Sequence, residues 1–90
     1  MRSGSNHDLQ VILHNDDYTP MEFVVGVLHE IIGMSKEEAI ETMLEVHRQG
    51  KAVCGLYAKD DAEAIVAQVL ERARRHGHPL LCTTVIQKNA

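Results

Sequence analysis

Residues 9–33 read LQVILHNDDYTPMEFVVGVLHEIIG, a segment whose pattern predicts a strand, a turn and a helix in succession. Its first five side chains form a short run rich in branched apolar residues, which predicts a β-strand over 9–13. Asn15-Asp16-Asp17 then favours a tight turn, because short polar side chains bond readily to nearby backbone groups. The segment therefore opens with a strand that ends at an acidic turn.

A helix signal follows the turn directly. Thr19 is a good N-cap, Pro20 suits the first helical position, and Glu22 would complete a capping box with Thr19. Apolar residues then recur at helical spacing as far as Gly33, where the helix should end. Strand, turn and helix thus come from one continuous segment.

Similar signals divide the rest of the chain, since capping residues open each helix and glycines close it. The expected elements are a helix capped by Ser35 with Glu38 and ended by Gly50, a strand over 51–58, a helix that opens with Asp60 and Glu63 and ends at Gly77, and a strand over 80–86. The apolar positions of these two helices are Ile40, Met43, Leu44 and Val46 in the first, and Ala62, Val66, Val69, Leu70 and Ala73 in the second.

The resulting order, β-α-α-β-α-β, predicts an α+β protein. We expect a single two-layer domain in which a three-stranded antiparallel sheet carries the helices on one face. The core should span residues 9–86, between a flexible N-terminal arm at 1–8 and a C-terminal tail at 87–90. Because a chain of 90 residues buries only a modest core, a ligand site should be a shallow pocket between elements.

Composition argues against several classes of partner. A net charge of -4, with two Tyr, one Phe and no Trp, disfavours nucleic-acid binding. No apolar run approaches the roughly 20 residues needed to span a bilayer. Cys54 and Cys82 are expected as buried thiols within strands, as is usual in a reducing cytosol. We therefore expect a cytoplasmic protein with neither a nucleic-acid nor a membrane partner.

The acidic turn carries more hydrogen-bond acceptors than a turn requires. Asn15, Asp16 and Asp17 supply two carboxylates and an amide, while Thr19 is already available as the N-cap. Such a cluster suits a primary ammonium group. His47, near the end of the second helix, would add a neutral imidazole acceptor. On the residues alone, the alternatives are a plain turn for the acidic run and a core or surface position for His47.

The sequence gives less support to a metal site or to covalent catalysis. His76 and His78 lack cysteine or carboxylate partners at a zinc-ligand spacing. Cys54 could be a nucleophile with His47 as its base, but the sequence places no acid to orient the histidine. A thiol within a strand is also usually inert. A glycine-rich phosphate loop is also missing. We expect no metal, no cofactor and no enzymatic activity.

Three motifs resemble those of ClpS, the bacterial adaptor family of the N-end rule. The first is VILHNDDYTPMEFV at 11–24, the second combines MLEVH at 43–47 with GKAVCG at 50–55, and the third is HPLLCT at 78–83. They stand in the same order as in that family. The resemblance extends from Leu9 to about Val85 and so covers nearly the whole chain.

The resemblance implies an adaptor that binds N-degrons, proteins whose first residue is Leu, Phe, Tyr or Trp, and delivers them to the AAA+ unfoldase ClpA of the ClpAP protease. The family's contacts to the substrate α-amino group fall on Asn15, Asp16, Asp17 and His47. Its pocket for the first side chain falls on Thr19, Met21, Val24, Met43, Val46 and Leu80, with Met21 as the gate against β-branched residues. Docking to the N-terminal domain of the unfoldase would involve Asp60, Glu63 and Ile65.

This sequence departs from the family pattern near both sites. His14 stands where the family typically has an aliphatic residue, and Ala64 and Ile65 replace a threonine and a lysine. The weighed alternatives are a non-catalytic interaction domain related to the C-terminal domain of the ribosomal stalk protein, an aminopeptidase-like hydrolase, and the recognition module of a eukaryotic ubiquitin ligase. Nothing in the sequence requires more than a monomer.

Overall fold

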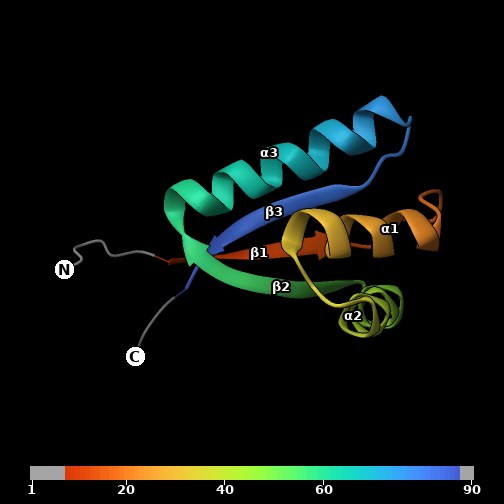
Figure 1. The fold of residues 1–90 in the computed structure, drawn as a ribbon, viewed down its shortest axis with the longest axis horizontal. Coiled ribbons are helices and arrows are strands. Elements are labelled where there is room, and N and C mark those ends of the chain that lie inside the picture. The colour runs from red at the N-terminus through yellow and green to blue at the C-terminus, as the bar shows by residue number, and fades with distance from the viewer. Residues whose placement is uncertain (1–7, 88–90) are drawn as a thin grey trace.

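The order of elements agrees with the sequence pattern (Figure 1). The structure, a computed structural model, describes residues 8–87. Its elements are β1 (Asp8–His14), α1 (Met21–Val27), the short π-helix η1 (Leu28–Ile32), α2 (Lys36–Gln49), β2 (Lys51–Ala58), α3 (Lys59–Arg75) and β3 (Leu81–Ile86). The predicted arm and tail lie outside the described residues, except for Asp8, which belongs to β1, and Gln87.

The three strands form one antiparallel sheet in the order β2-β1-β3, which confirms the predicted fold class. β1 pairs with both neighbours along its length. Leu13, for example, lies opposite Ala52 on one side and Cys82 on the other. The strand that leads into the acidic turn is therefore the central strand of the sheet.

The core lies between the sheet and the helices. Side chains alternate between the two faces of a strand, and in β1 the buried residues Leu9, Val11 and Leu13 face the helices. The helices add Val24, Val27, Leu28, Ala39, Met43, Val46, Ala62, Val69 and Ala73 to the same cluster.

Two of the apolar positions named for these helices lie outside the buried stripe. Ile40 is 45% exposed and Leu70 is 37% exposed. In each helix the buried stripe passes through the preceding residue, Ala39 in α2 and Val69 in α3. One step along a helix rotates a side chain by about 100°, which carries Ile40 and Leu70 to the border of the stripe.

The face of the sheet opposite the core, here called the open face, carries both apolar and polar side chains. Its side chains form three rows across the strands, Leu56–Gln10–Val85, Val53–Ile12–Thr83 and Lys51–His14–Leu81. Val53, Leu56, Leu81 and Val85 are each about half exposed, between 47% and 51%. The row that contains His14 lies at the end of the sheet from which the acidic turn leaves.

The capping box predicted at the start of α2 is confirmed. The N–H of Glu38 donates to Ser35 Oγ, and the N–H of Ser35 donates to Glu38 Oε1, both at 3.1 Å. The box predicted at Thr19 is wrong, because α1 begins one residue later with Pro20 as its N-cap and no side-chain cap. The Thr19 hydroxyl donates to Asp16 instead.

The predicted opening of α3 is also wrong. The helix starts at Lys59 with Ala58 as its N-cap, and no side chain caps it. β2 therefore runs into α3 without an intervening loop. Glu63, expected to take part in the cap, pairs with Lys59 one turn away, with Nζ and Oε2 3.2 Å apart.

Both cysteines are free, buried thiols within strands, as predicted. Burial raises the pKa of the Cys54 thiol to about 11 and that of Cys82 to about 12. The reactive thiolate form is therefore scarce at neutral pH.

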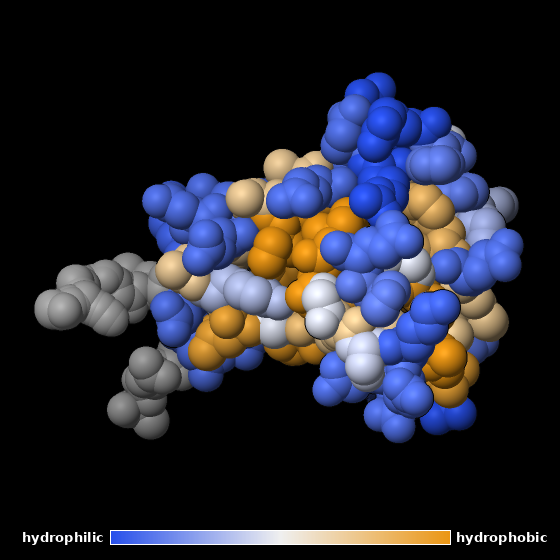
Figure 2. All heavy atoms as spheres, in the orientation of Figure 1, coloured by the Kyte–Doolittle hydropathy of each residue, from blue (hydrophilic) through white to orange (hydrophobic). Residues whose placement is uncertain are grey.

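The helical side of the molecule is mostly hydrophilic, with an apolar patch between α3 and α1 (Figure 2). Ile31 and Ile32 of η1, and Ile65 and Val66 of α3, are partly buried hydrophobic residues that pack against the core. Within residues 8–87, no helix combines the length and apolar character that crossing a membrane requires.

Candidate functional site

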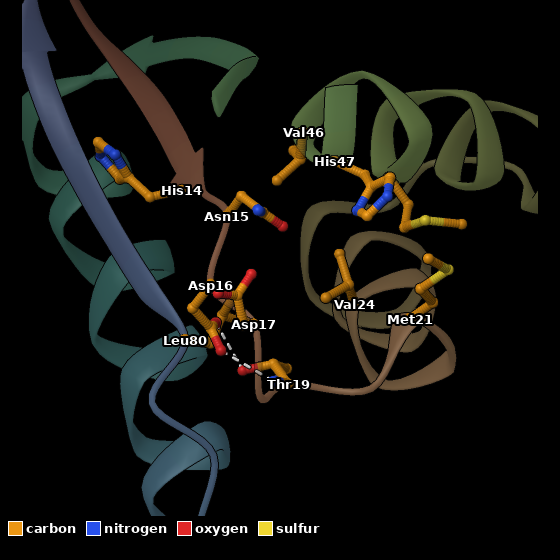
Figure 3. A pocket seen from close by; sticks show the side chains of 11 residues that line it. His14, Asn15, Asp16, Asp17, Thr19, Met21, Val24, Val46, His47 and Leu80 are labelled. Carbon is orange, nitrogen blue, oxygen red and sulfur yellow. Dashed lines mark hydrogen bonds between the residues drawn. The ribbon is translucent and has the colours of Figure 1, made fainter. Parts of the chain in front are cut away.

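A pocket opens where the end of β1, the loop 15–20, the start of α1 and the end of α2 meet (Figure 3). Its cavity volume is about 150 Å³. The lining residues are His14, Asn15, Asp16, Asp17, Thr19, Met21, Val24, Met43, Val46, His47 and Leu80. The fold thus brings together all four residues predicted to bind an amine and all six predicted to form the side-chain pocket.

The pocket has an apolar floor. Val24, Met43, Val46 and Leu80 are buried, with exposed fractions of 3% to 9%. They come from α1, α2 and the residue before β3, so three distant segments are required to close the floor. Such a floor suits an apolar side chain of modest size.

The mouth of the pocket is polar. Asn15, Asp17 and His47 are exposed, and Figure 3 shows the side chains of Asn15 and His47 pointing toward each other across the pocket. No hydrogen bond among the described residues engages these three side chains. Met21, also at the mouth, is 50% exposed. The mouth therefore offers amide, carboxylate and imidazole acceptors above an apolar floor.

Asp16 has a different role from its neighbours, because its carboxylate holds the loop together. Oδ1 accepts the backbone N–H groups of Tyr18 and Thr19, both at 2.8 Å, and Oδ2 accepts the Thr19 hydroxyl at 2.7 Å. Burial alone would raise the pKa of Asp16, but the hydrogen bonds from Thr19 and Tyr18 lower it overall. The Asp16 carboxylate thus makes turn contacts within its own loop, while the side chains of Asn15 and Asp17 make no hydrogen bond within residues 8–87.

Two contacts position the walls. The backbone N–H of Asn15 donates to the carbonyl oxygen of Gly50 at 2.9 Å, which ties the acidic loop to the end of α2. On the other side, the ring of Phe23 meets the ring of His78 edge to face, with centroids 4.5 Å apart. This contact holds the segment before Leu80 against α1.

His14 is a lining residue that lies outside the predicted set. Its Nε2 is 2.8 Å from Thr83 Oγ1, and Figure 3 shows its side chain directed away from the pocket, toward β3. The departure from an aliphatic residue was visible in the sequence. Its pairing with Thr83 was not, because that contact depends on the register of β1 and β3.

The three residues expected to dock an unfoldase lie elsewhere. Asp60, Glu63 and Ile65 occupy the first turns of α3, at the opposite end of the molecule from the pocket (Figure 1). The two acidic residues are exposed, whereas Ile65 packs partly against the core. These residues and the pocket therefore form separate surfaces.

No group of three or more His, Cys, Asp or Glu side chains within residues 8–87 is placed to hold a metal ion. His76 and His78 instead stack on each other, with ring centroids 6.3 Å apart, beside Phe23. Their rings extend the aromatic contact that supports the pocket.

Comparisons with known proteins agree with the fold. A family described as "ATP-dependent Clp protease adaptor protein ClpS" matches residues 5–83. The ClpS adapter of Phenylobacterium zucineum is 57% identical over 74 residues, which cover 82% of this chain and 68% of that protein. The ClpS adapter of Caulobacter vibrioides strain NA1000 is 55% identical, with the same coverage.

A solved structure is similar over almost its whole length. It shows Agrobacterium tumefaciens ClpS2 bound to L-phenylalaninamide, with a TM-score of 0.88 and 36% sequence identity. The match covers 90% of this chain and 98% of that one. The ligand in that structure has a free α-amino group and an apolar side chain.

Proposed function

Because the chain belongs to the ClpS family of Clp protease adaptor proteins, we propose that its pocket binds the free α-amino group and the bulky apolar side chain of N-degron substrates. The adaptor passes such substrates, which begin with Leu, Phe, Tyr or Trp, to a Clp AAA+ unfoldase and its protease. It thereby alters which proteins the protease degrades.

One observation carries the proposal, namely the division of the pocket into an acceptor-rich mouth and an apolar floor. Asn15, Asp17 and His47 hold the ammonium group, with the charge of Asp16 nearby. The first side chain enters the floor, and Met21 at the mouth acts as a gate against β-branched residues. The site needs both halves of its ligand, which only the first residue of a chain offers.

The energetics support this selectivity. Burying a Leu or Phe side chain favours binding by roughly 1.5–3 kcal/mol. Losing one hydrogen bond to a charged group costs about as much again, roughly 1.5–3 kcal/mol. Acetylation removes the charge and adds bulk at the mouth, so blocked N-termini are rejected on both counts.

We also propose a docking surface for the unfoldase, separate from the pocket. The first turns of α3, with Asp60, Glu63 and Ile65, dock the N-terminal domain of a ClpA-type unfoldase. Because these residues lie far from the pocket, cargo and unfoldase bind together. The protein acts as a cytoplasmic monomer, without catalytic activity, and uses neither metal nor cofactor.

The test uses fluorescent peptides that differ only at the first residue. We expect peptides with a free first Leu or Phe to bind, and their N-acetylated forms and a first Glu not to bind. Equal binding of the free and acetylated forms would refute the proposal. Incubation of the Leu peptide followed by mass spectrometry separates adaptor from aminopeptidase, because an adaptor leaves the peptide intact.

A further inference from the structure

Two walls of the pocket floor come from separate segments of the chain. Val24 lies on α1, whereas Leu80 lies in the segment that joins α3 to β3. Figure 3 shows Leu80 on the side of β3 and Val24 on the side of α1, with the pocket between them. The separation of these walls therefore limits the size of the apolar side chain that fits the floor.

An aromatic contact joins the two segments. Phe23 precedes Val24 on α1, and His78 lies two residues before Leu80. Their ring centroids are 4.5 Å apart, and the ring planes meet edge to face at 67°. Neither residue lines the pocket, so the contact can affect a ligand only through the walls that it positions.

The segment around His78 is fixed to α3 by its backbone. The N–H of His78 donates to the carbonyl oxygen of Ala73, a buried residue of α3, at 2.8 Å. Pro79, the next residue, restricts the backbone on the way to Leu80 because its ring fixes φ. The Leu80 wall therefore stays with α3, and the His78 ring holds α1, with its Val24 wall, against that segment.

His76 offers a comparison within the same cluster. Its ring centroid lies 5.5 Å from that of Phe23 and 6.3 Å from that of His78, and its side chain is exposed. It follows the last turn of α3 and is separated from the Leu80 segment by Gly77. The ring of His76 is therefore farther from α1 than that of His78.

We propose that His78 is a positioning residue that sets the size of the first side chain that the pocket accepts. The inference rests on the proposed function, because size selection requires that the pocket bind a first side chain. Closely held walls keep the cavity at about 150 Å³, which suits Leu or Phe better than the larger indole of Trp. A gap of even 0.5–1 Å would cost a small side chain much of its attraction to the walls. The contact thus favours the smaller members of the proposed substrate class.

The experiment measures the affinities of peptides that begin with free Leu, Phe or Trp and are otherwise identical. The quantity compared is the ratio of the Kd of the Trp peptide to that of the Leu peptide. His78→Ala should lower this ratio by about two- to tenfold, the range that an aromatic pair contributes, chiefly by weakening the Leu peptide. Fluorescence anisotropy measures the affinities, and circular dichroism checks the fold.

Further variants assign the effect to the ring contact. His78→Phe keeps an aromatic ring against Phe23 and should restore the ratio of the parent protein. His76→Ala is the matched control and should leave the ratio unchanged. Phe23→Leu should lower the ratio as His78→Ala does, and combining the two changes should lower it no further, because both remove one contact.

The outcomes separate this inference from the proposed function. If His78→Ala weakens the three free peptides by the same factor, or changes none of them, the positioning role is refuted and the adaptor function stands. An equal change of the ratio in His76→Ala, or no restoration in folded His78→Phe, also overturns the assignment. If the parent protein binds acetylated peptides as well as free ones, the adaptor function itself fails.

Discussion

The backbone N–H of Asn15 donates a hydrogen bond to the carbonyl oxygen of Gly50, with nitrogen and oxygen 2.9 Å apart. This bond joins the loop that follows β1 to the residue that ends α2. His47 lies three residues before Gly50, so the bond sets the separation between the two walls of the ammonium socket. One main-chain contact at Gly50 thus links the two sides of the mouth.

Gly50→Ala should weaken both stability and binding. Gly50 adopts a φ of 91°, a left-handed conformation that costs an L-residue about 1–2 kcal/mol. We expect the urea midpoint to fall accordingly and the affinity for a Leu-initiated peptide to drop. Gly26→Ala is the control, because it lies in α1 at a helical φ with open space around its Cβ position. Equal loss of stability in both variants would contradict the role of the turn.

Asp17→Ala or His47→Ala should reduce the affinity for free Leu peptides by more than about tenfold, or about 1.5 kcal/mol, because each removes an acceptor from a charged group. Folding should change little, since both side chains are exposed and make no hydrogen bond within residues 8–87. Fluorescence anisotropy measures the affinity. Asp61→Ala, an exposed acid on α3, is the matched control, and unchanged binding in folded Asp17→Ala would count against the assigned role.

Asp16→Asn should flatten the dependence of stability on acid pH. The folded-state pKa of Asp16 lies below its ordinary value of 3.8, so the ionised carboxylate stabilises the fold above that value. The contribution is lost as pH falls through the lowered pKa. Urea unfolding at pH 7 and near pH 3 should therefore show a smaller drop for Asp16→Asn than for the parent. Parallel curves for the two proteins would disprove the role of the loop bonds.

Cys54 and Cys82 should resist alkylation in the folded protein. Their pKa values of about 11 and about 12 leave almost no thiolate at pH 8, and both side chains are buried. Mass spectrometry after iodoacetamide should show unmodified protein without denaturant and two additions in urea. Rapid labelling of the native state would show that the strands open more readily than this core allows.

Sequence reasoning succeeded where the determinants are local or carried by long motifs. Ser35 and Glu38 lie three residues apart, so the capping box was predictable from their spacing alone. It failed at Thr19, because the Thr19 side chain could either cap the helix or bond within the loop. Thr19 is a fair N-cap, but its hydroxyl donates to the Asp16 carboxylate, and the helix starts at Met21 with Pro20 as its N-cap.

The pocket, too, was predictable only in part. Its ten predicted residues were identified from motifs, and the fold brings them together, although their binding roles stay predictions. The position of the His14 imidazole depends on a contact between residues 69 positions apart in sequence, since its partner is Thr83. A single sequence carries no signal for such a contact. Ile40 likewise has the apolar spacing of the helix, although it lies at the border of the buried stripe.

The central position of β1 also decides when the protein becomes active during its synthesis. Leu9 pairs with Tyr57 on one side and with Ile86 on the other, so the sheet closes only through contacts between residues distant in sequence. Leu80, just before β3, completes the pocket floor. A nascent chain therefore holds no complete pocket until β3 has left the ribosome.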